Sequence, residues 1–296
     1  MARWFRIALM TVMCLVGICC QPAEDVSARS MVQVKGSDTL INLVQRLAEV
    51  YMQKQPGKVV AVTGGGSGTG IAALINGKCD IANSSRLIKD KEIAQARERK
   101  VDPKRVIIAI DGLCVVTNAK NPVDKLTMDQ LGKMFRGEIK NWKDVGGENR
   151  PITLYGRQSN SGTYDFFMEV VLKGDYSPKM NQMNGNAQIV EAIKQDLSGI
   201  GYVGLGYVRD SKGTNVVKVA ARAGGYYGSP MNQQDVNAGK YPLTRPLQQY
   251  VNGMPKPLVK DFLAFELSKE GQEIVKQQGF IAIQPEYAKL NKNLGL

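Results

Sequence analysis

Three short segments of the sequence combine glycine with hydroxyl side chains, and each stands directly before a stretch with helical periodicity. They are residues 35–39, 64–70 and 157–163. Two of the three also contain charged residues. A helix that begins at such a segment presents unpaired backbone N–H groups and the positive end of its dipole. Serine and threonine hydroxyls add further hydrogen-bond donors. Each segment therefore indicates a site for an anion.

The third segment also carries a cation, because Arg157 stands ahead of Ser161, Gly162 and Thr163. A guanidinium group can hold two oxygens of a phosphate or carboxylate at once. Helix capping explains any one of the three segments taken alone, since Ser, Thr and Asp are favoured caps and Gly permits tight turns. Three segments of the same design favour a shared anionic ligand.

The first part of the chain alternates β-branched runs with amphipathic stretches, which is β-α-β-α order. After residues 31–76 the alternation continues through a strand at 80–83, a helix near 89–100 and a strand at 106–110. This order predicts an α/β lobe with a mostly parallel sheet flanked by helices. Residues 111–118 form a second apolar run directly after a strand, which predicts a crossover into another lobe.

A second α/β series of the same kind follows this crossover, so the sequence predicts a two-lobed α/β protein. Ligands of open α/β sheets lie at the carboxyl ends of the strands, and we expect the ligand in the cleft between the lobes. Binding then requires the lobes to close about a hinge. The predicted division is a signal segment at 1–28, a first lobe of 29–113 plus 246–296, and a second lobe of 114–245.

The composition excludes several classes of enzyme. The chain has no histidine, which excludes a Ser-His-Asp triad, a Cys-His pair and a histidine zinc site. The glycines of residues 64–70 lack the ending of a Walker A loop and the spacing of the dinucleotide fingerprint. No carboxylate-rich cluster suggests a catalytic metal. We therefore expect a binding protein rather than an enzyme, with no cofactor and no metal.

The formal net charge of the chain is +12. Its lysines and arginines are scattered, without a basic run or an aromatic RNA-binding motif, so we expect no nucleic-acid partner. A positive field that steers a small anion explains the charge. A basic surface tuned for solubility is the alternative.

The N-terminus has the pattern of a signal peptide. Two arginines precede an apolar run at 7–20, which is shorter than the roughly 20 residues that span a bilayer. The small residues at 26–28 predict cleavage after Ala28. Lipid attachment at Cys19 or Cys20 is the alternative. Either way, we expect a periplasmic or otherwise extracytoplasmic protein.

The chain beyond the signal segment keeps two cysteines, Cys79 and Cys114. They could form one disulfide at most. An oxidising compartment permits that bond, but free buried cysteine is also common in protein cores. The sequence leaves both alternatives open.

In their order along the chain, these motifs resemble those of the phosphate-specific substrate-binding proteins of ABC transporters, which have the type II periplasmic binding protein fold. The resemblance spans nearly all of the chain after the signal segment and rests on residues 36–39, 66–70, 80–86, 157–163, 199–203 and 241–247. It implies a monomer that captures inorganic phosphate and delivers it to permease subunits in the cytoplasmic membrane. It also implies phosphate contacts from Ser37, Asp38, Thr39, Ser67, Ser84, Ser85, Arg86, Arg157, Ser161, Gly162 and Thr163.

The sequence departs from the family pattern at the group that accepts the phosphate proton. Some members place an aspartate in the third-strand turn, where this chain has Ser85 followed by Arg86, and an acid two residues after the second-lobe arginine, where this chain has Ser159. Asp38 is therefore the expected acceptor. Its carboxylate would accept a hydrogen bond from protonated phosphate and repel sulfate, which has no proton at neutral pH. The alternatives are a helix N-cap for Asp38 and a surface ion pair for Arg86.

Two other functions stay open at this stage. The ligand could be another oxyanion, such as sulfate, molybdate or tungstate, and Asp38 is the feature that discriminates against these. The same fold could also serve a sensor or adhesin that does not take part in transport.

Overall fold

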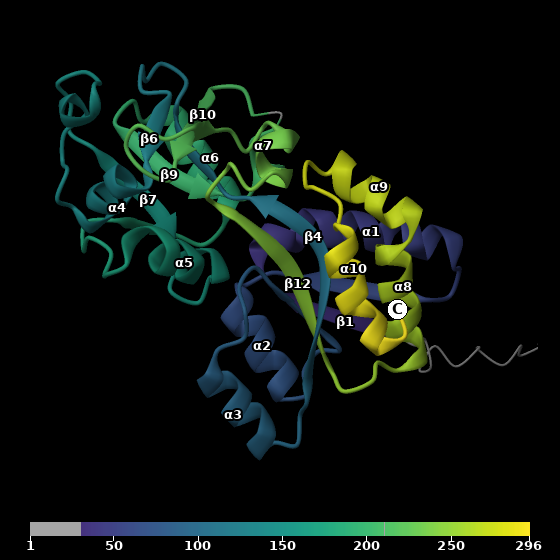
Figure 1. Cartoon of the computed structure of the whole chain (residues 1–296). Helices are drawn as coiled ribbons and strands as arrows, with labels where there is room; N and C mark the ends of the chain where they lie inside the picture. Colours follow the sequence, from purple (N-terminus) through teal and green to yellow (C-terminus); the bar gives the residue numbers. More distant parts are fainter. Residues whose placement is uncertain (1–30, 210) are drawn as a thin grey trace, which may run out of the picture.

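The computed structural model describes residues 31–209 and 211–296. The predicted signal segment, with Cys19, Cys20 and the cleavage point at Ala28, lies outside these residues. No helix of the described part is both long enough and apolar enough to cross a membrane. Figure 1 shows two groups of elements, each built around its own sheet, with the long strands β4 and β12 running between them.

A five-stranded sheet organises what we call the first lobe. Its strand order is β2-β1-β3-β12-β4. Strand β1 is parallel to β2 and β3, whereas β12 is antiparallel to β3 and β4. The strands span Met31–Gly36 (β1), Val59–Thr63 (β2), Ile81–Ser84 (β3), Pro103–Gly112 (β4) and Thr244–Asn252 (β12).

Helices cover both faces of this sheet, so its strands are buried on both sides. Ile81 and Val251 pack into the cluster that includes α1, α8 and α9, whereas their neighbours Ala82 and Tyr250 pack against α2 and α3. The helices span Ile41–Lys54 (α1), Ser67–Ile75 (α2), Asp90–Glu98 (α3), Pro257–Leu267 (α8), Lys269–Gln277 (α9) and Pro285–Asn291 (α10), with short 3-10 turns at Asp38–Leu40 (η2) and Lys292–Leu294 (η6).

A seven-stranded sheet organises the second lobe. Its order is β11-β10-β5-β9-β7-β8, and β6 pairs with β10. An aromatic group fills the core beside it, where the rings of Phe167 and Tyr202 stack with centroids 4.2 Å apart. The strands span Cys114–Asn118 (β5), Lys125–Thr127 (β6), Thr153–Arg157 (β7), Asn181–Met183 (β8), Gly199–Val203 (β9), Thr214–Ala220 (β10) and Tyr227–Gly228 (β11).

Four α-helices flank the second sheet among the described residues. They are Met128–Arg136 (α4), Gly162–Phe167 (α5), Asn186–Gln195 (α6) and Gln233–Asn237 (α7), and shorter helical segments span Trp142–Val145 (η3), Met168–Leu172 (η4) and Leu205–Tyr207 (η5). In η3 the indole N–H of Trp142, a buried side chain, donates to the carbonyl of Ser198 at 2.9 Å.

The sheets are mixed rather than mostly parallel, which corrects this part of the sequence prediction. In the second sheet β7 is parallel to β8 and β9, but β5 is antiparallel to both β9 and β10. Except for the pair of β10 with β11, the antiparallel pairs involve the strands that carry the chain between the sheets. Strand β4 leads out of the first lobe and continues into β5, and β12 returns beside β4 in the opposite direction.

The predicted crossover is confirmed. The chain leaves the first sheet at Gly112 and enters the second at Cys114, with only Leu113 between them. The alternatives for the cysteines are also resolved in the structure. Cys79 and Cys114 are both free thiols, and Cys114 is buried.

Glu266 on α8 is a carboxylic acid within the core of the first lobe. Its side chain is fully buried, Oε1 accepts from Gln249 Nε2 at 3.1 Å, and Oε2 has no partner among the described residues. Burial raises the pKa of Glu266 to about 8, although the bond from Gln249 opposes the shift. The protonated form is therefore the one that the folded state favours.

We predict that this residue makes the fold less stable as the pH rises. Its contribution is fully present below its ordinary pKa of 4.5 and is lost between there and about 8. The loss should amount to on the order of a few kcal/mol in the free energy of unfolding. Glu266→Gln keeps the hydrogen bond without the charge, so urea unfolding from pH 5 to pH 9 should give a flatter curve for the variant. Parallel curves for the two proteins would show that Glu266 does not titrate in this range.

Candidate anion-binding site between the lobes

Five buried hydroxyl side chains meet where the lobes face each other. Ser85 Oγ lies 3.0 Å from Ser37 Oγ, 3.3 Å from Ser67 Oγ and 3.4 Å from Thr163 Oγ1. Thr163 Oγ1 in turn lies 3.0 Å from Thr39 Oγ1. We call this set the hydroxyl cluster. Thr163 belongs to the second lobe and the other four residues to the first, so the two lobes share the site.

The carboxyl ends of strands and the first turns of helices position these hydroxyls. Ser37 and Ser85 follow β1 and β3, which are parallel neighbours and end at the same edge of the sheet. Ser67 opens α2. Ser161 caps α5, and its Oγ accepts from the backbone N–H of Thr163 at 3.2 Å. The three segments singled out in the sequence are thus brought to one place, as expected.

Gly162 allows α5 to come this close to the first lobe. A β-carbon at this position would overlap Ser67 Oγ and lie 2.9 Å from Ser85 Oγ. Asn160, two residues before Gly162, adds hydrogen bonds across the lobes through its backbone carbonyl and its side chain. Its carbonyl accepts from Gly68 N at 3.0 Å, and its Nδ2 donates to Gly65 O at 2.9 Å. The structure is therefore in a closed arrangement.

Arg157, the last residue of β7, is 1% exposed and lies beside the cluster. Its Nη2 donates to the Asp38 carboxylate and, at 2.8 Å, to Asn184 O. The other oxygen of Asp38 accepts from Gly65 N at 2.9 Å. Arg157 Nη1 is buried with no partner among the residues that the structure describes. A buried donor without a protein partner is costly, so this nitrogen is available to an acceptor on a bound ligand.

Two functional candidates were not found from the sequence. Arg245 on β12 donates to Asp111 Oδ2 from Nε at 3.0 Å and from Nη2 at 2.9 Å, and both side chains are buried. Arg245 also reaches the cluster, through Nη2 to Thr163 Oγ1 at 3.0 Å and through Nη1 to Ser85 O at 3.1 Å. Asp111 Oδ1 accepts from Leu205 N of the second lobe at 2.9 Å. The available signal was a carboxylate, Asp111, directly after the apolar run 106–110.

Two residues predicted as ligand contacts have side chains that bond away from the hydroxyl cluster. Ser84 Oγ donates to the carbonyl of Arg86 at 2.7 Å and so closes the turn after β3. Arg86 is held by Glu92, which accepts from Nη1 and from Nη2, each at 2.7 Å. Its Nε also lies 2.9 Å from Asp165 Oδ2. The ion-pair alternative for Arg86 therefore describes its contacts here, but the pair is buried rather than on the surface.

The arrangement can hold a small oxyanion but offers little for catalysis. Hydroxyls, helix N-termini and the unpaired Nη1 of Arg157 are donors, while the charge of Arg157 is balanced by Asp38 and that of Arg245 by Asp111. Among the described residues, no group of His, Cys, Asp and Glu side chains is placed to hold a metal ion.

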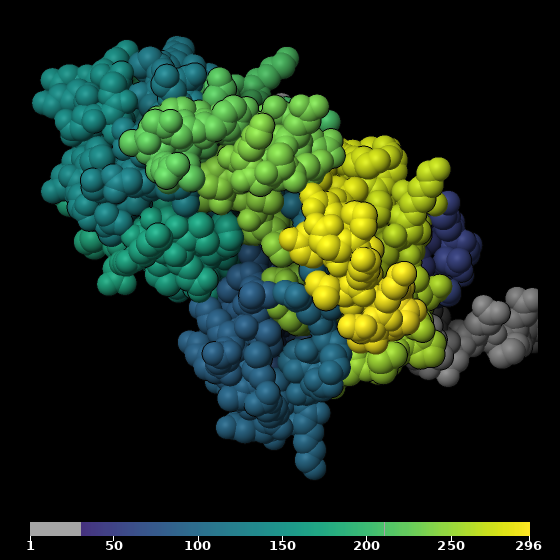
Figure 2. Space-filling view, in the orientation of Figure 1, coloured from purple at the N-terminus to yellow at the C-terminus, as the bar shows by residue number. Residues whose placement is uncertain are grey.

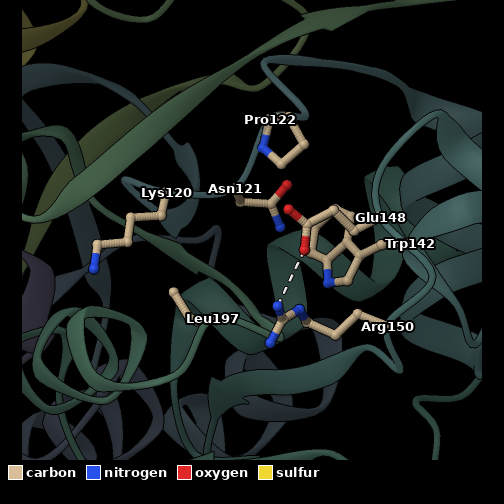
Figure 3. A pocket seen from close by; sticks show the side chains of 7 residues that line it. All are labelled: Lys120, Asn121, Pro122, Trp142, Glu148, Arg150 and Leu197. Atoms are coloured by element: carbon tan, nitrogen blue, oxygen red, sulfur yellow. Dashed lines mark hydrogen bonds and ion pairs between the residues drawn. The ribbon is translucent and has the colours of Figure 1, made fainter.

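A groove borders the hydroxyl cluster, and Ser85 and Arg86 are among the residues that line it. It has a volume of about 590 Å³ and separates the lobes over Arg245 and Gln248, and Figure 2 shows the molecule hollowed between the lobes on the face in view. Figure 3 shows a smaller pocket of about 170 Å³ in the second lobe, next to the ion pair of Glu148 and Arg150. None of the predicted ligand contacts lines this second pocket.

A family model described as the PBP superfamily domain matches residues 22–270. The chain belongs to this superfamily. Among its members, the phosphate-binding protein PstS of Pseudomonas aeruginosa is 38% identical over 88% of this chain and 86% of its own length. The phosphate-binding protein PstS of Bacillus subtilis is 31% identical over 86% of this chain and 82% of its own length.

Solved structures of this superfamily share the fold. A putative phosphate ABC transporter substrate-binding protein from Clostridium perfringens, solved with bound phosphate, matches with a TM-score of 0.77 and 30% identity over 86% of this chain and 100% of that one. An ABC-type phosphate transport receptor from Vibrio cholerae matches with a TM-score of 0.68 and 27% identity over 85% and 100%. These matches confirm the predicted two-lobed fold class.

The pair of Asp111 and Arg245 should be essential to the stability of this site. We predict that Asp111→Asn lowers the free energy of unfolding by about 3–5 kcal/mol, because it leaves the Arg245 guanidinium buried without a countercharge. Asp129→Asn is the matched control, since Asp129 forms an exposed pair with Lys133 at 2.8 Å and should cost less than about 1 kcal/mol. Equal effects of the two substitutions in urea unfolding would contradict this account.

Proposed function

We propose that this protein binds inorganic phosphate between its lobes and delivers it to the permease of an ABC transporter. The observation that carries the proposal is the buried Nη1 of Arg157, which finds no partner within residues 31–209 and 211–296 and lies next to hydroxyls contributed by both lobes. The relatives named as phosphate-binding proteins and the related structure with bound phosphate support the same ligand. Binding, rather than catalysis, is the activity of the superfamily to which the chain belongs.

The phosphate oxygens take the place of the present bonds between hydroxyls. Each hydroxyl can rotate to donate to an oxygen, and the N-termini of α2 and α5 add backbone donors. Arg157 supplies the charge-assisted contact through Nη1. The proposed contacts are Ser37, Asp38, Thr39, Ser67, Ser85, Arg157, Ser161, Gly162 and Thr163, with Ser84 and Arg86 shaping the turn after β3.

The two lobes open about the strands that connect them. We place the boundaries at 29–113 plus 246–296 for the first lobe and at 114–245 for the second. In support, the chain changes sheet between β4 and β5 and returns through β12. The protein acts as an exported monomer, released after Ala28 or held by a lipid at Cys19 or Cys20.

The experiment that tests the function is calorimetric titration of the purified, ligand-free protein. Phosphate and its close analogue arsenate should bind, and sulfate and molybdate should bind far more weakly or not at all. Preferential binding of sulfate or molybdate would replace phosphate by another oxyanion. No binding of any of the four would refute the proposed function.

Arg157→Ala should weaken phosphate binding by about 2–4 kcal/mol, equivalent to roughly 30- to 1,000-fold in Kd. The change removes a charged donor from a site without bulk water, and Arg157→Lys should restore only part of the affinity because an ammonium cannot form the same pair of contacts. Arg150→Ala, at an exposed arginine of the second lobe, is the control and should leave Kd unchanged. An Arg157→Ala protein with the affinity of the wild type would place the anion elsewhere.

Asp38 should set the preference for phosphate over sulfate. In Asp38→Asn the amide can donate to any oxyanion, so both the contact specific to protonated phosphate and the repulsion of sulfate disappear. The gap between the two binding free energies should narrow by on the order of 2–4 kcal/mol. Competition titrations of the two anions measure it. If the difference in binding free energy between phosphate and sulfate were unchanged, Asp38 would have no role in selectivity and would serve only as the partner of Arg157 and Gly65.

A further inference from the structure

Four charged side chains, of which Arg86 and Asp165 are buried, form an ion-pair network next to the hydroxyl cluster, and the network crosses from one lobe to the other. Asp165 lies on α5 of the second lobe. Its Oδ2 lies 2.9 Å from Arg86 Nε and 2.7 Å from Lys89 Nζ, both of the first lobe. Glu92 on α3 completes the network. Figure 1 shows α5 facing the side of the first lobe that carries α2 and α3.

The first-lobe half of this network is held in place whether or not the lobes meet. Glu92 grips the guanidinium of Arg86 with both carboxylate oxygens, at 2.7 Å each. It also accepts from the backbone N–H of Lys89 at 2.9 Å, at the start of α3. Burial by itself would lower the pKa of Arg86, but the bond to Glu92 and the charges of Glu92 and Asp165 raise it. Two cations are thus positioned for a carboxylate that arrives from the other lobe.

Asp165 depends on these cations. Its side chain is 6% exposed, and within the described part of the chain both of its ion-pair partners come from the first lobe. The closed network holds two positive and two negative charges. Separating the lobes leaves Asp165 without a partner on one side and an excess positive charge on the other. The network therefore adds to the stability of the closed form through charges that are not part of the ligand.

Both terminal nitrogens of Arg86 are already engaged. Nη1 donates to Glu92 and to Leu87 O, and Nη2 donates to Glu92. The remaining nitrogen, Nε, faces Asp165 Oδ2 at 2.9 Å as an ion pair, although it makes no hydrogen bond within the described residues. The position of the network is nevertheless close to the site, because Arg86 follows Ser85 directly and Asp165 lies two residues after Thr163. Closure around the ligand and formation of the network are thus movements of the same two segments.

We propose that Arg86, Lys89 and Asp165 form a closure latch that sets how slowly the bound anion leaves, and that Arg86 is a positioning residue rather than a ligand contact. This inference rests on the proposed function, since it assigns these residues a role in retaining the phosphate. Release requires the lobes to open, and opening breaks the latch. Entry takes place while the lobes are open, so the latch does not contribute to it.

The test measures release and capture of radiolabelled inorganic phosphate by the full protein. Asp165→Asn, which keeps the shape of the side chain, should raise the dissociation rate constant on the order of 10-fold, within the usual range of coupling between sites. Lys89→Gln removes the more exposed of the two cations, at 33%, and should give a smaller increase. The association rate constant should stay the same or rise. Glu191→Gln, at an exposed pair with Lys194 in the second lobe, is the control and should change neither constant.

Dissociation rates of Asp165→Asn and Lys89→Gln within twofold of the wild type would overturn the latch. So would a fall in the association rate with unchanged dissociation, because that result would mean that these residues shape the site itself. If the wild type binds no phosphate, the proposed function fails, and small-angle scattering of the ligand-free proteins decides the latch separately. A larger radius of gyration for Asp165→Asn than for the wild type and Glu191→Gln supports it, and equal radii overturn it.

Discussion

The antiparallel pairing of β4 with β12 is the constraint on which the rest of the structure depends. These strands carry the chain out of the first lobe and back, and their register sets Asp111 opposite Arg245. The ion pair between them contacts the second lobe through Leu205 N and Thr163 Oγ1 and the first through Ser85 O. A single pair of strands therefore provides the covalent connection between the lobes and also positions the ion pair of Asp111 and Arg245 beside the hydroxyl cluster.

The protein's own carboxylates balance the charges around the hydroxyl cluster. Each of the two arginines nearest the hydroxyl cluster has its own aspartate, Asp38 for Arg157 and Asp111 for Arg245. Two unpaired guanidinium groups in a buried site would repel each other, and burial already lowers the pKa of Arg245. The hydroxyls likewise bond to one another. An incoming anion is therefore met by dipoles that reorient, together with Arg157 Nη1, which has no partner among the described residues.

The sequence predicted the loops of the site better than the partners of individual side chains. Gly, Ser and Thr before a periodic stretch are local signals, and they located Ser37, Ser67 and Thr163 because helix starts at strand ends depend on neighbouring residues. The fold class followed from the β-α order for the same reason. The direction of strand pairing could not be predicted in this way, since it depends on where a returning strand such as β12 enters the sheet. The ion-pair network around Arg86 could not be predicted from the sequence either, because Asp165 approaches Arg86 only once the two lobes have folded and met.

The position of Trp142 gives the molecule a natural spectroscopic division. It is the only tryptophan among residues 29–296, and its indole is buried in the second lobe and bonded to Ser198 O. The first-lobe core has tyrosines instead, including Tyr51 and Tyr250. Emission excited at the red edge of the indole band thus reports the second lobe alone. Comparing it with the circular dichroism of the whole chain reveals whether the two lobes melt as one cooperative unit or in separate steps.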